Sequence, residues 1–160
     1  MLNKALLQVT KNELLKYSET INQSVISDQT YWIRKSKKVV LAMVCIQVVT
    51  PNSTNALPEL KFVPGINIEV SIATGSICAE RNAISTAFSM YPNLQKQDIL
   101  CIAIGSFNLI DRKLYHIRPC CVCGAWLDKI WGKRWKANVI SLSEIQKNNP
   151  LEESHSVNFQ

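Results

Sequence analysis

The chain has 160 residues, of which 47% are hydrophobic and 19% charged, and its formal net charge is +6. These totals fit one globular domain with a full core, and the longest apolar run, at 39–49, is too short to cross a bilayer. We therefore expect a single domain over residues 1–160 and no membrane span. The first residues lack the apolar stretch of a signal peptide, which favours a cytoplasmic protein. Six cysteines in such a chain indicate metal binding or catalysis rather than disulfides.

The first half of the chain predicts two helices with strands between them. Apolar residues at helical spacing predict a helix over 3–25, and a valine-rich run predicts a buried strand over 39–49. The segment 61–70 can hold a second, short strand. From Ser76 the apolar period becomes helical, and Ser76 or Thr74 is placed to cap that helix. The buried face of that helix is expected to carry Ala79, Ala83, Ile84, Ala87 and Phe88.

The second half repeats this alternation. A buried strand is predicted over 98–104, followed by a polar stretch at 105–118. A proline then opens a helix over 119–131, and a strand over 137–142 and a helix over 143–148 follow. Alternating strands and helices indicate the α/β class, with helices covering a central sheet.

Three cysteines fall at the starts of two predicted helices. Cys120 and Cys123 have the i, i+3 spacing of two thiolates that share a tetrahedral metal, and Cys78 can supply a third. Helix N-termini lower the pKa of such thiols and favour the metal-bound form. Three protein ligands leave zinc a fourth position, which is typical of a catalytic site. Glu80, two residues after Cys78, is then placed to exchange protons with water there.

The two halves of this pattern, C-A-E in "TGSICAERNAI" and P-C-x-x-C in "RPCCVCG", together form a signature of zinc deaminases. The chain resembles the cytidine deaminases, and in particular their nucleoside branch with three cysteine ligands. The resemblance is close over 65–88 and 118–130. It implies a cytidine-deaminase-like αβα sandwich with a central mixed sheet of about five strands, and Zn2+ as the cofactor.

The resemblance also implies roles for individual residues. An Asn-x-Glu on the strand before the zinc helix grips the ribose in this family, and the matching residues are Asn67 and Glu69. By strand periodicity alone these two are only a polar face. Arg81 matches an arginine that tempers the negative charge of three thiolates on zinc. The implied reaction is hydrolytic deamination of a small pyrimidine nucleoside, cytidine or deoxycytidine, to the uracil nucleoside with release of ammonia. The implied assembly is a homodimer or homotetramer.

Several features depart from the family pattern. The two cysteine motifs are farther apart than is common, so 105–118 is interpreted as an insertion, and Gly124-Ala125 replaces the usual Arg-Gln. Basic residues interleave with tryptophans near 34–38 and over 129–136, a pattern that can bind single-stranded nucleic acid. At this net charge a solvated helix end with tryptophans in the core or at a subunit contact is favoured. Two alternatives stay open: an RNA base deaminase, and a non-catalytic subunit that keeps zinc for structure.

Overall fold

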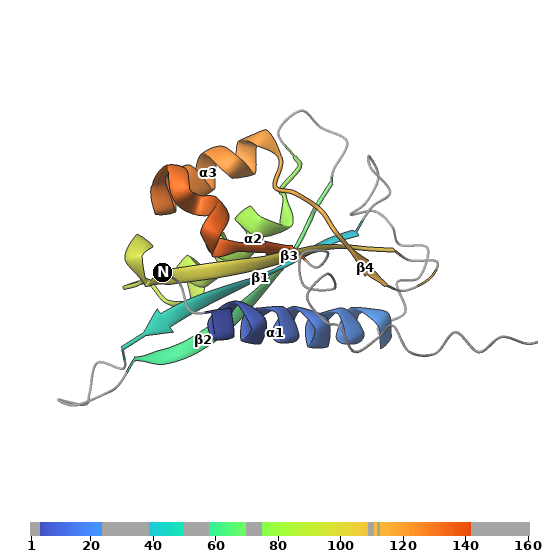
Figure 1. The fold of residues 1–160 in the computed structure, drawn as a ribbon, viewed down its shortest axis with the longest axis horizontal. Coiled ribbons are helices and arrows are strands. Elements are labelled where there is room, and N and C mark those ends of the chain that lie inside the picture. The colour runs from blue at the N-terminus through green and yellow to red at the C-terminus, as the bar shows by residue number, and fades with distance from the viewer. Residues whose placement is uncertain are drawn as a thin grey trace, which may run out of the picture.

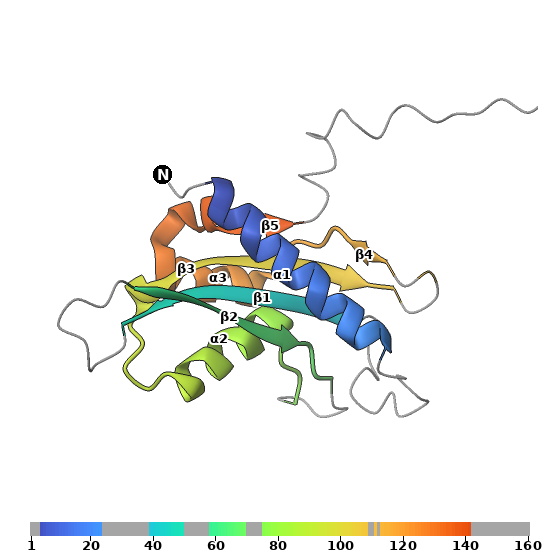
Figure 2. The same cartoon turned by 90° about the horizontal axis from the view of Figure 1, so that it is seen from below.

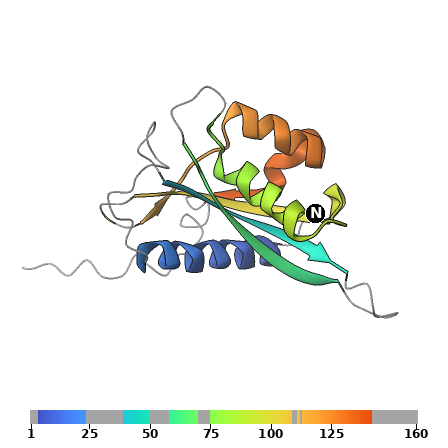
Figure 3. The same cartoon turned by 180° about the vertical axis from the view of Figure 1, so that it is seen from behind.

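Helices cover both faces of a central sheet in the computed structural model of the chain (Figure 1). Helix α1 (Lys4–Gln23) lies on one face, and α2 (Ala79–Met90) and α3 (Cys121–Trp131) lie on the other. The same three layers are seen from behind in Figure 3. The predicted αβα sandwich is therefore confirmed. The structure describes residues 4–23, 39–49, 58–69, 75–108, 111 and 113–141.

Five strands form a mixed sheet. β2 and β3 flank β1 and run antiparallel to it, and the outer edge of β3 is shared by β4, which is antiparallel, and β5, which is parallel. Two short 3-10 segments, η2 and η3, lead into β3 and β5. The bounds are β1 (Val39–Val48), β2 (Glu59–Ile66), β3 (Ile99–Phe107), β4 (Leu114–Tyr115), β5 (Val139–Ser141), η2 (Lys96–Asp98) and η3 (Gly132–Asn138).

The sheet separates two apolar cores. Side chains alternate along a strand, so Ala42 and Val44 of β1 join the core beneath α2 and α3, whereas Leu41 and Met43 join the core beneath α1. Figure 2 shows α1 crossing its face of the sheet. Burial on both faces explains why the sequence of β1 is a continuous apolar run rather than an alternating one.

Two cysteines pack beneath α1. Cys45 of β1 and Cys101 of β3 are directly opposite each other in the antiparallel register, and both are fully buried. The hydroxyl oxygen of Thr10 in α1 lies 3.2 Å from the sulfur of Cys101. This contact joins the buried face of α1 to the sheet.

Strand β2 approaches the start of α2 most closely at Gly65. A Cβ atom at this position would lie 2.4 Å from the carbonyl oxygen of Ala79 and 2.4 Å from the backbone nitrogen of Ala83. Only glycine permits such an approach of strand to helix backbone. The first turn of α2 is thereby seated directly on the sheet.

The structure corrects three predictions. Helix α2 begins at Ala79, because Cys78 and not Ser76 has the extended N-cap conformation. The stretch 105–118 is not only a polar connection, since β3 continues to Phe107 and β4 pairs with its end. Phe88, expected on the buried face of α2, is 39% exposed, because alanines spaced four apart form the face that meets the sheet.

The tryptophans near η3 belong to the fold. Trp131 and Trp135 pack against the core beneath α2 and α3, and the indole nitrogen of Trp131 donates to the carbonyl oxygen of Ile99 at 2.7 Å. The tryptophans therefore pack as expected, and whether the basic residues around them bind nucleic acid stays a prediction. The predicted helix over 143–148 and the basic cluster near 34–38 lie outside the described residues. Within the described part of the chain, no helix is long and apolar enough to cross a membrane.

Candidate metal centre

Both helices above the sheet begin at a cysteine. Cys78 is the N-cap of α2 and Cys120 is the N-cap of α3, each with extended backbone angles. The sulfur of Cys120 accepts a hydrogen bond from the backbone N–H of Cys123 at 3.4 Å. The positive ends of two helix dipoles therefore face the same thiols, which favours thiolate over thiol.

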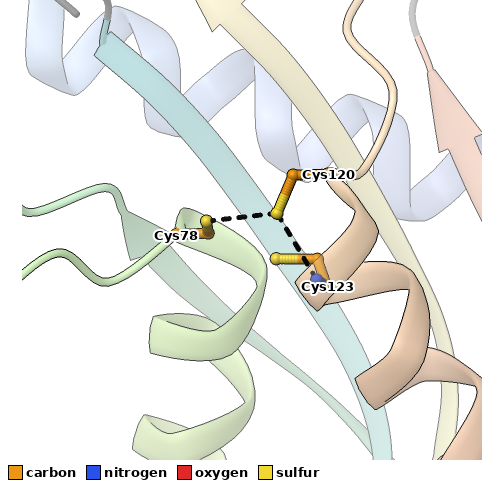
Figure 4. Close-up of side chains that lie close together, drawn as sticks. All are labelled: Cys78, Cys120 and Cys123. Atoms are coloured by element: carbon orange, nitrogen blue, oxygen red, sulfur yellow. Dashed lines mark hydrogen bonds between the residues drawn. The ribbon is translucent and has the colours of Figure 1, made fainter. Parts of the chain in front are cut away.

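The structure brings all three predicted ligands together (Figure 4). The sulfurs of Cys78, Cys120 and Cys123 lie within 4.8 Å of one another, and those of Cys78 and Cys120 are 3.7 Å apart. Tetrahedral zinc holds sulfur at about 2.3 Å, which sets neighbouring sulfurs about 3.8 Å apart. The three cysteines are free thiols. Their spacing fits a shared metal ion of this kind.

The three thiols have different electrostatic surroundings. Burial raises the pKa of Cys123 far above its ordinary value, and the nearby Glu80 and Cys78 raise it further. Burial likewise raises the pKa of Cys78. Burial also acts upward on the pKa of Cys120, but the backbone N–H of Cys123 and the neighbouring thiols outweigh it, and the net direction is down. A metal cation reverses such upward shifts, because it holds the thiolate form.

Glu80 is a buried carboxyl beside these sulfurs. It lies in the first turn of α2 and is 5% exposed. Burial raises its pKa, and interactions with Cys123 and Arg81 only partly oppose that shift. A carboxyl whose pKa moves toward neutrality can both accept and return a proton, which is what a proton carrier in hydrolysis needs.

Arg81 lies between the cysteines and a tryptophan of α3. Its Nη2 donates to the carbonyl oxygen of Ser76 at 3.3 Å, and its guanidinium carbon is 6.0 Å from the centre of the Trp126 ring. The nearby Cys78 and Cys123 outweigh the lowering effect of burial and raise the pKa of Arg81. The Trp126 contact could not be predicted from the sequence, because Arg81 and Trp126 are on different helices.

Asn67 and Glu69 follow β2 and lie next to the start of α2. Ile68 and Ile77 exchange two backbone hydrogen bonds of 2.9 and 2.8 Å, which fixes this segment beside Cys78. The amide nitrogen of the Asn67 side chain is 3.4 Å from a carboxylate oxygen of Glu69.

Asn67 also has a structural role that the sequence did not indicate. Its side-chain oxygen accepts from the backbone N–H of Val40 at 2.7 Å, and its own N–H donates to the carbonyl oxygen of Val40 at 3.0 Å. Asn67 is 5% exposed. It extends the β1–β2 pairing by one residue beyond the end of β2, and its role toward a sugar stays a prediction.

Comparisons with known proteins complete the description of this site. Residues 5–113 match the sequence model of the LmjF365940 subfamily of CDD/CDA-like deaminases, a match that includes Cys78 and Glu80 and ends before Cys120. Among solved structures, the chain is similar to a cytidine deaminase from Burkholderia pseudomallei, with 18% identity, 76% of each chain covered and a TM-score of 0.49. No curated protein sequence matches the chain.

Proposed function

The chain belongs to the CDD/CDA-like deaminase family, and on that premise we propose that it removes the amino group of a cytosine nucleoside by hydrolysis, with zinc as cofactor. The substrates are cytidine or deoxycytidine, and the products are the uracil nucleoside and ammonia. The observation that carries this proposal is the group of three close sulfurs, on Cys78, Cys120 and Cys123, beside the buried carboxyl of Glu80. The sulfurs suit a metal and the carboxyl suits proton transfer.

When bound by the three cysteines, zinc supplies a Lewis acid that lowers the pKa of water toward neutrality. The protein's own proton chemistry is the task of Glu80. Its carboxylate takes a proton from the attacking water and delivers it to the ring nitrogen next to the amino-bearing carbon. A second proton passes by the same carboxylate to the departing amine. Burial of Glu80 supports this role, because it raises the pKa of the carboxyl above its ordinary value.

Two further roles are part of the proposal. Arg81 offsets the negative charge of the thiolates, and its closeness to Cys78 and Cys123 supports this. Asn67 and Glu69 hold the sugar hydroxyls, and the backbone bridge that fixes their segment beside Cys78 supports that placement. Removal of the Glu69 carboxylate therefore weakens the binding of nucleosides more than the binding of the free base.

A homodimer or homotetramer is also proposed. Three large apolar side chains near the cysteines are 41–49% exposed: Ile77, Trp126 and Val122. A second copy of the chain covering them would remove apolar surface from water and help to enclose the site. Light scattering of the purified protein measures this directly.

The test of the proposed reaction is turnover of free cytidine and deoxycytidine by the zinc-loaded protein, with uridine and ammonia both quantified. We expect equimolar products, formed at least ~100-fold more slowly by Glu80→Gln. Free cytosine is expected to be a poor substrate. An inert protein that retains zinc would favour a structural role for the metal, and activity confined to RNA would favour a base-editing enzyme.

A further inference from the structure

A groove lies beside the connection that carries Cys120. The chain segment 116–119 forms one wall, and the end of η3 together with β5 forms the other. The groove encloses about 440 Å³, which is within the usual range for a ligand pocket. Pro119 lines it, and the next residue along the chain is the metal-site Cys120. A residue that lines the groove and a candidate metal ligand are therefore adjacent in the chain.

The lining of this groove is basic. Arg118 and Lys136 line it, His116 lines it as well, and no lining residue is acidic. Among the residues that the structure describes, neither Arg118 nor Lys136 forms an ion pair. Two unneutralised cations around one hollow attract an anion, and an arginine fork can bind two phosphate oxygens at once.

The remaining lining residues make the groove a defined site. The Nδ1 atom of His116 contacts the Oγ atom of Ser141, which holds the 116–119 segment against β5. Trp135 is half-buried against the core and offers a fixed aromatic wall. The backbone segments that carry Arg118 and Lys136 are therefore packed against the sheet and the core.

The position of the groove also suits a ligand. Val139 and Ser141 of β5 line it, and β5 runs parallel to β3. The groove thus runs along β5, and Pro119 in its lining precedes Cys120 of the candidate metal centre in the chain.

We infer that this groove holds the phosphate of a nucleotide whose cytosine base occupies the metal centre. The inference rests on the proposed function. It names cytosine nucleotides, rather than unphosphorylated nucleosides, as the preferred substrates. A nucleoside monophosphate and a short oligonucleotide both present this group. Arg118 and Lys136 bind the phosphate, and Trp135 bounds the space it enters.

The experiment is calorimetric titration of cytidine 5′-monophosphate into the zinc-loaded Glu80→Gln protein, in which the ligand is not consumed. We expect Arg118→Gln and Lys136→Gln each to weaken binding at least ~10-fold, because a hydrogen-bonded charge partner is lost. The matched control is Lys133→Gln, which removes a charge from the same η3 segment outside the groove and is expected to leave binding unchanged. Zinc content is measured for every variant.

Unaltered binding in both groove variants would overturn the inference, as would equal loss in Lys133→Gln. A parallel titration with a cytosine-containing hexanucleotide separates the two phosphate sources. Tighter binding with a steeper salt dependence than the monophosphate shows indicates an oligonucleotide. If the active protein deaminates no cytosine compound while Arg118 and Lys136 still control binding, the proposed reaction fails and the phosphate groove stands. If cytidine is deaminated but the groove variants bind the nucleotide normally, the proposed reaction stands and the phosphate groove is refuted.

Discussion

The sulfurs of Cys78 and Cys120 lie 3.7 Å apart, although 42 positions separate the two residues in the chain. This closeness comes from two helices packed on one face of the same sheet, each with a cysteine as its N-cap. The packed helices themselves set the spacing, so the site is arranged in advance for a metal.

The purified protein is expected to hold about one zinc ion per chain, since three thiols at this spacing fill three of the four positions around zinc. Cys120→Ser should lose most of the metal. Cys121→Ser is the matched control, because Cys121 is exposed and outside the cluster. Elemental analysis of the three proteins decides the matter, and zinc retained in Cys120→Ser would refute the assignment.

Chelation should lower thermal stability. A ligand that binds only the folded state stabilises it by about 3 kcal/mol at 100 times its Kd, which is roughly 5–10 °C in Tm for a chain of this size. Calorimetric scans with and without a chelator measure this, and added zinc, but not magnesium, should restore the original Tm. The Cys120→Ser protein provides the control, because its Tm should not respond to the chelator.

Glu80→Gln should keep zinc and fold but reduce deamination by at least ~100-fold, because the proton carrier is lost while the sulfurs are untouched. Its free energy of unfolding should be no lower than that of the wild type, because a neutral amide replaces a carboxyl that is 5% exposed. Glu59→Gln makes the same change at an exposed residue of β2 and should be fully active. Wild-type rates in Glu80→Gln would assign proton transfer to another group.

Asn67→Ala should cost about 1–3 kcal/mol in the free energy of unfolding, because the N–H of Val40 loses its 2.7 Å acceptor. Urea unfolding measures this, with Asn93→Ala in an exposed turn as the control. Any loss of activity in Asn67→Ala therefore includes a structural part. Glu69→Ala is the cleaner test of sugar binding, and equal relative rates on cytosine and cytidine before and after that change would contradict the proposed role.

Gly65→Ala should destabilise the protein by about 1–3 kcal/mol, because its methyl group would overlap the backbone of α2 at Ala79 and Ala83. Gly124→Ala is the contrasting variant. A Cβ atom there meets only the Trp135 ring at 3.5 Å, and alanine favours a helix over glycine by up to about 1 kcal/mol. Chemical denaturation of both variants should therefore show shifts of opposite sign, and an unchanged Gly65→Ala would mean that α2 is free to move away.

The sequence predicted the features that depend on local spacing. Each of these patterns lies within one short segment: the i, i+3 cysteine pair, the apolar run of β1 and the helical period after Cys78. The metal cluster and the order of the layers could therefore be predicted from them. The features it missed depend on tertiary contact. The Asn67–Val40 pairing and the Arg81–Trp126 contact join residues from different elements. The basic groove was missed for the same reason, since Arg118 and Lys136 lie in separate segments.

The two cores on opposite sides of the sheet have a consequence for how this chain can vary. The core beneath α1, which includes Leu14 and Phe107, contains none of the residues of the cysteine cluster. Volume-conserving substitutions there are constrained only by packing and leave the reactive layer as it is. The core beneath α2 and α3 supports the helices that position the three sulfurs, so it should tolerate fewer substitutions. We therefore expect that substitutions beneath α1, whether they arise by evolution or by design, can change the stability of the fold. Such substitutions should leave the activity of the site on the other face of the sheet unchanged.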